Sequence, residues 1–181
     1  VNIWSDVCSA VTCNPEADEW FSRFLEQDVC LVYMPDNSGR LTDPLFGENQ
    51  SPVSFADGYP FLLISEASLM DLNKRLPVPL EMNRFRPNLV IGGCAPYEED
   101  RWRLIRVGGI LFEVVKPCSR CTITTVHPKT AETGKEPLKT LASYRKVGSK
   151  VYLGQNLIHR NQGILKTGMK LQILKQVMKP F

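Results

Sequence analysis

Short runs of apolar and β-branched residues recur along the 181-residue sequence, and most are closed by proline or glycine. Runs of this kind, bounded by turn formers, are typical of short strands. We expect strands at 29–35, 59–65, 88–93, 102–109, 110–117, 121–128, 150–161 and 169–177. The runs 102–109 and 110–117 should pair as a hairpin around Gly108 and Gly109. The sequence contains no internal repeat.

Three segments have the signals of helices instead. In 14–27, Asn14 is a candidate N-cap, Pro15 suits the first helical position, and acidic residues occupy the first turn. Ser65 can cap a second helix over 65–76, and 138–147 is predicted to be a third. Leucines recur along the second helix at Leu69, Leu72 and Leu76, which places them on one side.

Between these elements, 36–54 is rich in turn formers and is expected to be a long surface loop. Many short strands with few helices favour an α+β, mainly β fold with a barrel-like core and peripheral helices. The length suits one domain, which we place at 1–181.

The composition describes a soluble globular protein, with 43% hydrophobic and 23% charged residues. The charge is unevenly distributed. Residues 1–115 contain 9 Lys/Arg and 17 Asp/Glu, whereas residues 116–181 contain 13 Lys/Arg and 2 Asp/Glu. Such a split indicates either an anionic ligand or partner for the C-terminal half, or a solvated basic face. No signal favours a nucleic-acid partner.

Six cysteines are present, and in a chain of this length reduced thiols are expected. Two of them form Cys118-Ser119-Arg120-Cys121. A zinc site needs four ligands, and the only histidines, His127 and His159, do not supply the usual spacing. A redox dithiol usually opens a helix, but β-branched residues follow here. Two inert cysteines, or a thiolate ligand for a soft transition metal, are the other interpretations.

A second constellation is Arg84-Phe85-Arg86-Pro87-Asn88, at the start of a predicted strand. Proline disfavours helical backbone in the preceding residue, so we expect Arg86 to be extended. Arg86 and Asn88 should then project on the same side and present donors suited to a phosphate or to the edge of a heterocycle. A surface arginine beside a turn asparagine is the simpler alternative.

The phrases SEASLMDLN, FRPN and CSRC, in this order, resemble the MOSC domain. More closely, the chain is similar to the mitochondrial amidoxime-reducing component and its bacterial relatives, from about residue 16 to the C-terminal strands. The resemblance implies a mainly β fold that binds the molybdenum cofactor, a pterin with one phosphate and a dithiolene that holds the metal.

The resemblance also assigns the candidate site residues. Cys121, the second cysteine of CSRC, matches the molybdenum ligand and is the candidate catalytic residue. Positions that contact the cofactor in the family correspond here to Asp57, Arg86, Asn88, Ser119 and Arg120. Thiolate suits a soft metal, and arginine suits phosphate and carbonyl oxygens. Cys118 is then a neighbour of the site.

The chain departs from the family pattern in three respects. The aspartate of the family's TTVDP is replaced by His127, and 130–150 is shorter than usual. The family normally has a preceding β-rich domain with a Lys-Ser segment that grips the pterin, and we expect this part to be lacking here. No cysteine follows Cys121, whereas some bacterial relatives have an iron–sulfur domain there.

The resemblance therefore implies a molybdenum-cofactor oxidoreductase that reduces N-hydroxylated substrates such as amidoximes and hydroxylamines. Its electrons would come from an external donor, such as a cytochrome b5-type protein served by an NADH-dependent reductase. The location stays open between the cytoplasm and the mitochondrial outer membrane. The main alternative is a non-catalytic MOSC module that binds or transfers cofactor or sulfur, and the second is a structural domain with inert thiols.

Overall fold

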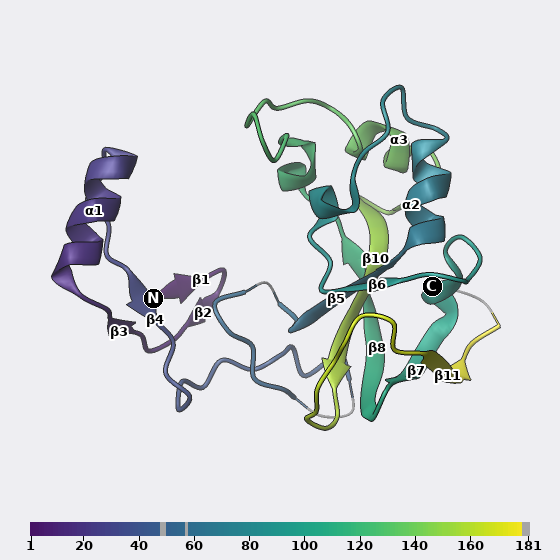
Figure 1. Ribbon diagram of the computed structural model, residues 1–181, viewed down its shortest axis with the longest axis horizontal. Coiled ribbons are helices and arrows are strands. Elements are labelled where there is room, and N and C mark those ends of the chain that lie inside the picture. The colour runs from purple at the N-terminus through teal and green to yellow at the C-terminus, as the bar shows by residue number, and fades with distance from the viewer. Residues whose placement is uncertain (48–49, 57, 179–181) are drawn as a thin grey trace.

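In the computed structural model, the described residues are 1–47, 50–56 and 58–178. The first forty residues form small elements beside the main sheet, in the purple to blue part of Figure 1. Two hairpin-like pairs and one helix make up this segment: β1 (Asn2–Ile3) with β2 (Asp6–Val7), β3 (Val11–Thr12) with β4 (Val32–Tyr33), and α1 (Pro15–Leu25).

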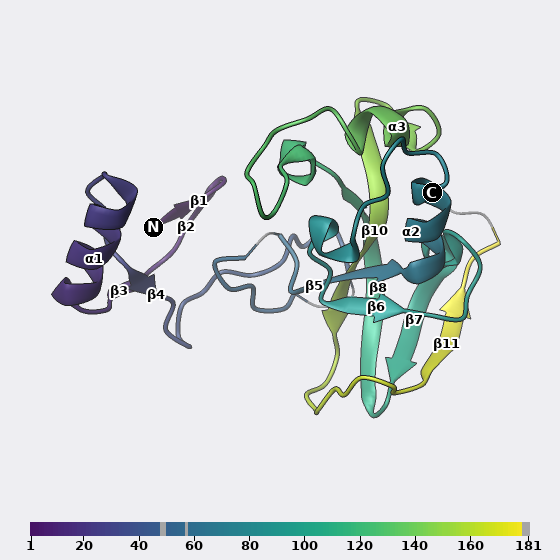
Figure 2. The ribbon, with the colours of Figure 1, turned by 45° about the horizontal axis from the view of Figure 1, so that its top comes forward.

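The rest of the chain is built around one curled sheet (Figure 2). Within the described ranges it has seven strands, in the order β11-β7-β8-β10-β5-β6, with β9 pairing on β10. β5 and β6 are parallel and the other pairs are antiparallel. The strands are β5 (Phe61–Ser65), β6 (Leu89–Ile91), β7 (Trp102–Val107), β8 (Ile110–Ser119), β9 (Lys146–Val147), β10 (Lys150–His159) and β11 (Leu171–Gln176). The predicted mainly β, barrel-like fold is confirmed.

Two hydrophobic cores lie on opposite faces of this sheet. Successive residues of a strand point to opposite faces, and in β5 the fully buried Leu63 and Ile64 belong to different clusters. Leu63 packs with Trp102, Ile105 and Phe112. Ile64 packs with Leu72 of α2 (Glu66–Asn73) and Leu141 of α3 (Leu138–Ala142). These helices cover one side of the sheet, at the upper right of Figure 1.

Several sequence predictions are confirmed. Asn14 caps α1 by accepting from the Ala17 N–H at 2.7 Å, and Ser65 caps α2 by accepting from the Ser68 N–H at 3.0 Å. The hairpin turns at Gly108 and Gly109, because Val107 pairs with Ile110. The helix predicted over 65–76 is α2, which ends earlier, at Asn73. Leu72 within it and Leu76 beyond its end are buried, and Leu69 packs against the same cluster.

Other predictions are wrong. The buried strand expected at 29–35 is reduced to the two residues of β4, where Tyr33 is exposed. The helix expected at 138–147 ends at Ala142, and β9 follows. The strand expected at 121–128 is instead a 3₁₀ helix, η3 (Thr122–Thr125). Its threonine hydroxyls explain the turn, because Thr124 donates to the Cys121 carbonyl and Thr125 to that of Thr122.

A bulge in β10 brings a polar side chain into the interior. The pairing of β10 with β8 shifts between Tyr152 and Gln155, and Gly154 lies there with φ of +82°. A Cβ on Gly154 would approach Ile64 Cγ1 to 2.6 Å and the Leu63 carbonyl to 2.8 Å, so only glycine fits. Gln155 is consequently buried, with 1% of its surface exposed.

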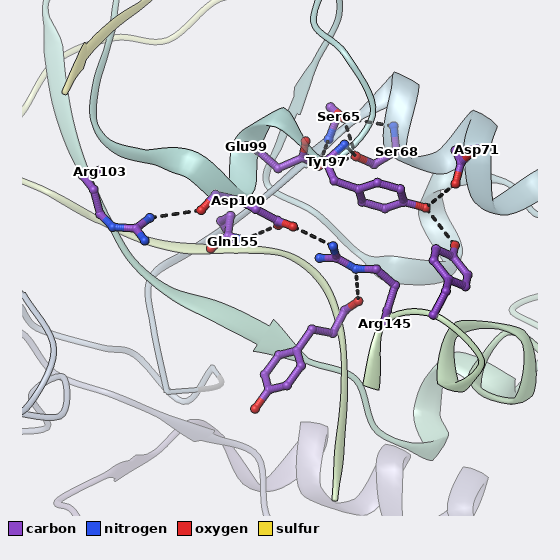
Figure 3. A network of polar contacts seen from close by, with 11 residues as sticks. Ser65, Ser68, Asp71, Tyr97, Glu99, Asp100, Arg103, Arg145 and Gln155 are labelled. Atoms are coloured by element: carbon purple, nitrogen blue, oxygen red, sulfur yellow. Dashed lines mark hydrogen bonds and ion pairs between the residues drawn. The ribbon is translucent and has the colours of Figure 1, made fainter. Parts of the chain in front are cut away.

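Gln155 belongs to a buried polar network (Figure 3). Its amide donates to Asp100 Oδ1 at 2.7 Å, while Arg145 Nη1 contacts Asp100 Oδ2 at 2.6 Å. Asp100 lies in the 3₁₀ helix η2 (Glu98–Arg101), whose Glu99 accepts from the Ser65 N–H and the Ser68 hydroxyl. The network therefore joins the start of α2, η2 and β10.

Replacing Asp100 by alanine should destabilise the fold strongly. Its side chain is 2% exposed, and removing it leaves the Arg145 guanidinium buried without its carboxylate. Loss of one partner from such a pair costs about 3–5 kcal/mol. Urea unfolding followed by circular dichroism measures this cost. Glu19→Ala is the control, because Glu19 pairs with Arg23 in full solvent and should cost less than about 1 kcal/mol. Equal, small losses in both variants would contradict the structural role of Asp100.

Candidate functional site

The CSRC segment is held at the end of the longest strands. Cys118 and Ser119 are the last residues of β8, and Ser119 pairs with Tyr152 of β10. The Arg120 N–H then donates to the Val151 carbonyl at 2.8 Å. Cys121 comes after the strand, at the N-cap position of η3, and is exposed. The Cys121 thiol thus lies just beyond the end of β8 and is accessible to ligands.

The Arg120 side chain connects this segment to the FRPN segment. Arg120 Nη2 donates to the Phe85 carbonyl at 2.9 Å, and its Nη1 donates to Cys118 Sγ at 3.0 Å. The guanidinium carbon lies 5.6 Å from the centre of the buried Phe85 ring. Arg120 Nε is buried and has no hydrogen-bond partner among the described residues. Two motifs 30 residues apart in the sequence are therefore neighbours.

The FRPN segment differs from the sequence prediction. Arg86 is not extended: its φ of 54° and ψ of 47° are left-handed. The reason is the 3₁₀ helix η1 (Met82–Phe85), which ends there when the Arg86 N–H donates to the Asn83 carbonyl. Arg86 is exposed.

Asn88, the other donor expected from this segment, is used within the fold. Its Oδ1 accepts from the Leu62 N–H at 2.8 Å, and its own N–H donates to the Leu62 carbonyl at 2.9 Å. These two bonds lie next to the parallel pairing of β5 with β6, which starts at Leu63 and Leu89. Asn88 therefore fixes where the two strands meet.

A cleft of about 740 Å³ opens beside the CSRC segment. Three of the four CSRC residues line it, namely Cys118, Ser119 and Cys121. Among the described residues, Arg86, Asn88 and Arg120 do not line this cleft. Asp57 lies outside the described residues, and its neighbours Gly58 and Tyr59 are part of the cleft wall. A volume of this size is typical of sites for cofactors and small molecules.

The cleft also contains residues that the sequence analysis missed. Lys116 and Asn156 face one another across β8 and β10 and both line it. The first hairpin contributes Trp4, Ser5 and Asp6. Arg40, 6% exposed, holds that hairpin in place by contacting Asp6 at 2.9 Å and the carbonyls of Ser54 and Ala56 at 2.8 Å. The cross-strand register brings Lys116 and Asn156 together, and the contacts of Arg40 hold the hairpin; the sequence reveals neither.

In the part of the chain that the structure describes, no three His, Cys, Asp or Glu side chains cluster as a metal site. No disulfide joins any of the six cysteines. None of the described helices has the length and hydrophobicity to cross a membrane.

Comparison with known proteins identifies the family. The sequence pattern of the MOSC domain matches residues 50–172, a range that contains both motifs and all strands of the main sheet except most of β11. The chain belongs to the MOSC domain family. The predicted resemblance is thereby confirmed.

The named relatives of this MOSC protein fall into two groups. It is 36% identical to the mitochondrial amidoxime-reducing component 1 of Mus musculus over 178 residues, which cover 91% of the chain and 52% of that relative. The protein of the same name from Danio rerio is 40% identical, and the match covers 86% of the chain and 51% of that relative. A molybdenum cofactor sulfurase of Oryza sativa is 33% identical, and the match covers 85% of the chain and 21% of that relative. The chain spans about half the length of the amidoxime-reducing relatives it matches.

His127, at the position where the family resemblance implies an aspartate, accepts backbone hydrogen bonds in this MOSC domain. Its Nδ1 accepts from the N–H groups of Lys129 and Thr130, at 3.3 and 3.2 Å. Aspartate in a turn uses its carboxylate in the same way, accepting from backbone N–H groups two residues on. The imidazole therefore substitutes for the carboxylate as the acceptor of this turn, close to η3 and Cys121.

His127→Asp should accordingly be tolerated, with a change in the free energy of unfolding within about 0.5 kcal/mol. His127→Ala removes the acceptor and should cost about 1 kcal/mol, the typical loss for a capping side chain. Chemical denaturation of the three proteins at neutral pH tests both expectations. If His127→Asp costs as much as His127→Ala, the imidazole does more than accept these two bonds.

Proposed function

We propose that this chain holds the molybdenum cofactor through Cys121 and belongs to an oxidoreductase that reduces N-hydroxylated compounds. The observation that carries the proposal is the exposed Cys121 thiol, fixed at the end of β8 on the wall of a cleft of about 740 Å³. The relatives named for amidoxime reduction support the substrate class. Amidoximes and hydroxylamines are therefore the proposed substrates.

The residues present suit such a cofactor. A thiolate is a good ligand for a soft metal, and the cleft is large enough for a pterin. Ser119 shares the cleft wall with Cys121. Arg120 has a buried Nε without a partner among the described residues, which leaves one donor of its guanidinium available beside the site. We propose that Asp57, Arg86 and Asn88 complete the cofactor contacts, as the family pattern implies.

When bound, the cofactor would supply the two-electron redox chemistry that the side chains of this chain lack. The reaction takes up two electrons and two protons, cleaves the N–O bond of the substrate, and releases water. The chain's own part is to hold the metal through Cys121 and to orient the substrate in the cleft. Arg120 supports the CSRC segment by connecting it to the Phe85 carbonyl.

An external donor, such as a cytochrome b5-type protein with an NADH-dependent reductase, is the proposed source of electrons. A mitochondrial location is part of the same proposal, since the amidoxime-reducing relatives are named as mitochondrial.

A second candidate function is a module that binds or transfers cofactor or sulfur without reducing a substrate. The similarity to a molybdenum cofactor sulfurase favours it. The test is to measure molybdenum, pterin and amidoxime reduction in protein from a cofactor-competent host. The same measurements on a version extended by a relative's preceding domain show whether the 181-residue chain suffices. Bound cofactor without reduction in either version would favour the second candidate.

Cys121→Ser should abolish molybdenum retention, because a hydroxyl is a poor ligand for a soft metal. Cys118→Ser should be milder, since a hydroxyl oxygen can still accept the bond from Arg120 Nη1. Metal analysis and pterin fluorescence of the purified variants give the answer, with circular dichroism to verify the fold. Equal loss in both folded variants would show that the two thiols act jointly.

Arg86→Lys should lower cofactor occupancy although the charge is retained. A planar guanidinium recognises phosphate or carbonyl oxygens with two parallel bonds, which an ammonium cannot reproduce. One charge-assisted hydrogen bond is worth about 1.5–3 kcal/mol, so the affinity should fall by about tenfold or more. Arg84→Lys, two residues away, is the control. Unchanged occupancy at limiting cofactor would remove Arg86 from the proposed site.

A further inference from the structure

The cleft beside Cys121 contains an ammonium group, that of Lys116, which has no anionic partner in the part of the chain that the structure describes. Lys116 lies on β8 and lines the cleft, and among the described residues no carboxylate pairs with it. The other cation in the cleft wall, Arg40, is already committed to Asp6 and two carbonyls. Asp43 also lines the cleft, where its Oδ1 accepts from the Leu45 N–H at 2.9 Å.

Aromatic rings hold the Lys116 ammonium in place. Its Nζ lies 4.2 Å from the centre of the Phe46 ring and 5.9 Å from that of Tyr59. An aromatic face attracts a cation through its quadrupole but carries no net charge. The rings therefore position the ammonium without neutralising its charge, and no carboxylate of the described residues forms an ion pair with it.

Tyr59 adds no negative charge to this wall. Burial, with a smaller contribution from Asp43, raises the pKa of Tyr59 to about 12, so the phenol stays neutral at physiological pH. Its buried hydroxyl has no hydrogen-bond partner among the described residues. On the opposite strand, Asn156 pairs with Lys116 and lines the same cleft, where its amide N–H can donate to an oxyanion.

We propose that Lys116, with Asn156, forms an anion subsite beside Cys121 and selects N-hydroxylated substrates that also carry a carboxylate. One ammonium and one amide match a single negative charge shared by two oxygens. A phosphate carries more charge, and the planar fork of arginine matches its oxygens with two parallel bonds, which a single ammonium does not form. The inference deepens the proposed function and rests on it for the identity of the substrate.

The test compares two probes that differ only in the carboxylate, 4-carboxybenzamidoxime and benzamidoxime. Their binding to the 181-residue protein is measured by calorimetry, with no requirement for turnover. The wild type should bind the carboxylate probe about tenfold more tightly, as expected for one charge-assisted hydrogen bond. Lys116→Met should remove this preference and leave the neutral probe unaffected, and Lys116→Arg should retain part of it. Added salt should weaken only the carboxylate probe.

Lys139→Met is the matched control, because Lys139 is an exposed lysine of α3 and does not line the cleft. In cofactor-loaded protein, the ratio of kcat/KM for the two probes should follow the binding ratio. Equal binding of both probes by the wild type, or no binding of either, would overturn the subsite. So would a Lys116→Met variant that loses pterin but keeps the carboxylate preference, since Lys116 would then contact the cofactor. Absence of molybdenum and reduction would overturn only the proposed function.

Discussion

The buried ion pair of Asp100 with Arg145 is the contact on which the site geometry depends. Removing two charges from water is costly, and this pair offsets the cost by engaging further polar groups. Asp100 also accepts from Gln155, and Arg145 Nε donates to the Tyr152 carbonyl at 3.2 Å. The Tyr152 N–H in turn donates to the Arg145 carbonyl at 3.0 Å. The pair thereby fixes the first half of β10 on both sides of its bulge.

Backbone hydrogen bonds connect β10 to the CSRC segment of the candidate site. Tyr152 pairs with Ser119, and the Val151 carbonyl accepts from the Arg120 N–H. Arg120 then extends its guanidinium to the Phe85 carbonyl and the Cys118 thiol. Cys121, which no strand holds, is consequently placed by residues on either side of it: β8 before, and the threonine-closed turn η3 after. Both neighbouring elements thus define its backbone position, while its side chain is exposed.

Local signals in the sequence predicted the elements that depend on local interactions. The caps at Asn14 and Ser65 and the hairpin at Gly108 and Gly109 are of this kind. The strand predicted after Cys121 does not form, because threonine hydroxyls donate to nearby backbone carbonyls and close a turn. The β propensity of threonine does not include such local hydrogen bonds. The left-handed Arg86 and the cleft residues Lys116 and Asn156 depend on a preceding turn and on strand register, which have no local signature. The family resemblance supplied Cys121, whereas residue chemistry alone left its role open.

The polar residues of the motifs divide into two groups by what their donors and acceptors contact. The side chains of Asn88 and Arg40 form hydrogen bonds with the backbone or with a side chain of the same chain. Both terminal nitrogens of Arg120 also bond within the fold, to the Cys118 thiol and the Phe85 carbonyl. Removing such a group leaves its partner without a hydrogen bond, so the first contribution of these residues is to the shape of the fold around the cleft. Cys121 and Lys116 instead have functional groups without such commitments among the described residues, and both face the same cleft. A soft ligand and a cation that no described carboxylate pairs with thus line one cleft, whose shape is supported by the contacts of Arg40 and Arg120.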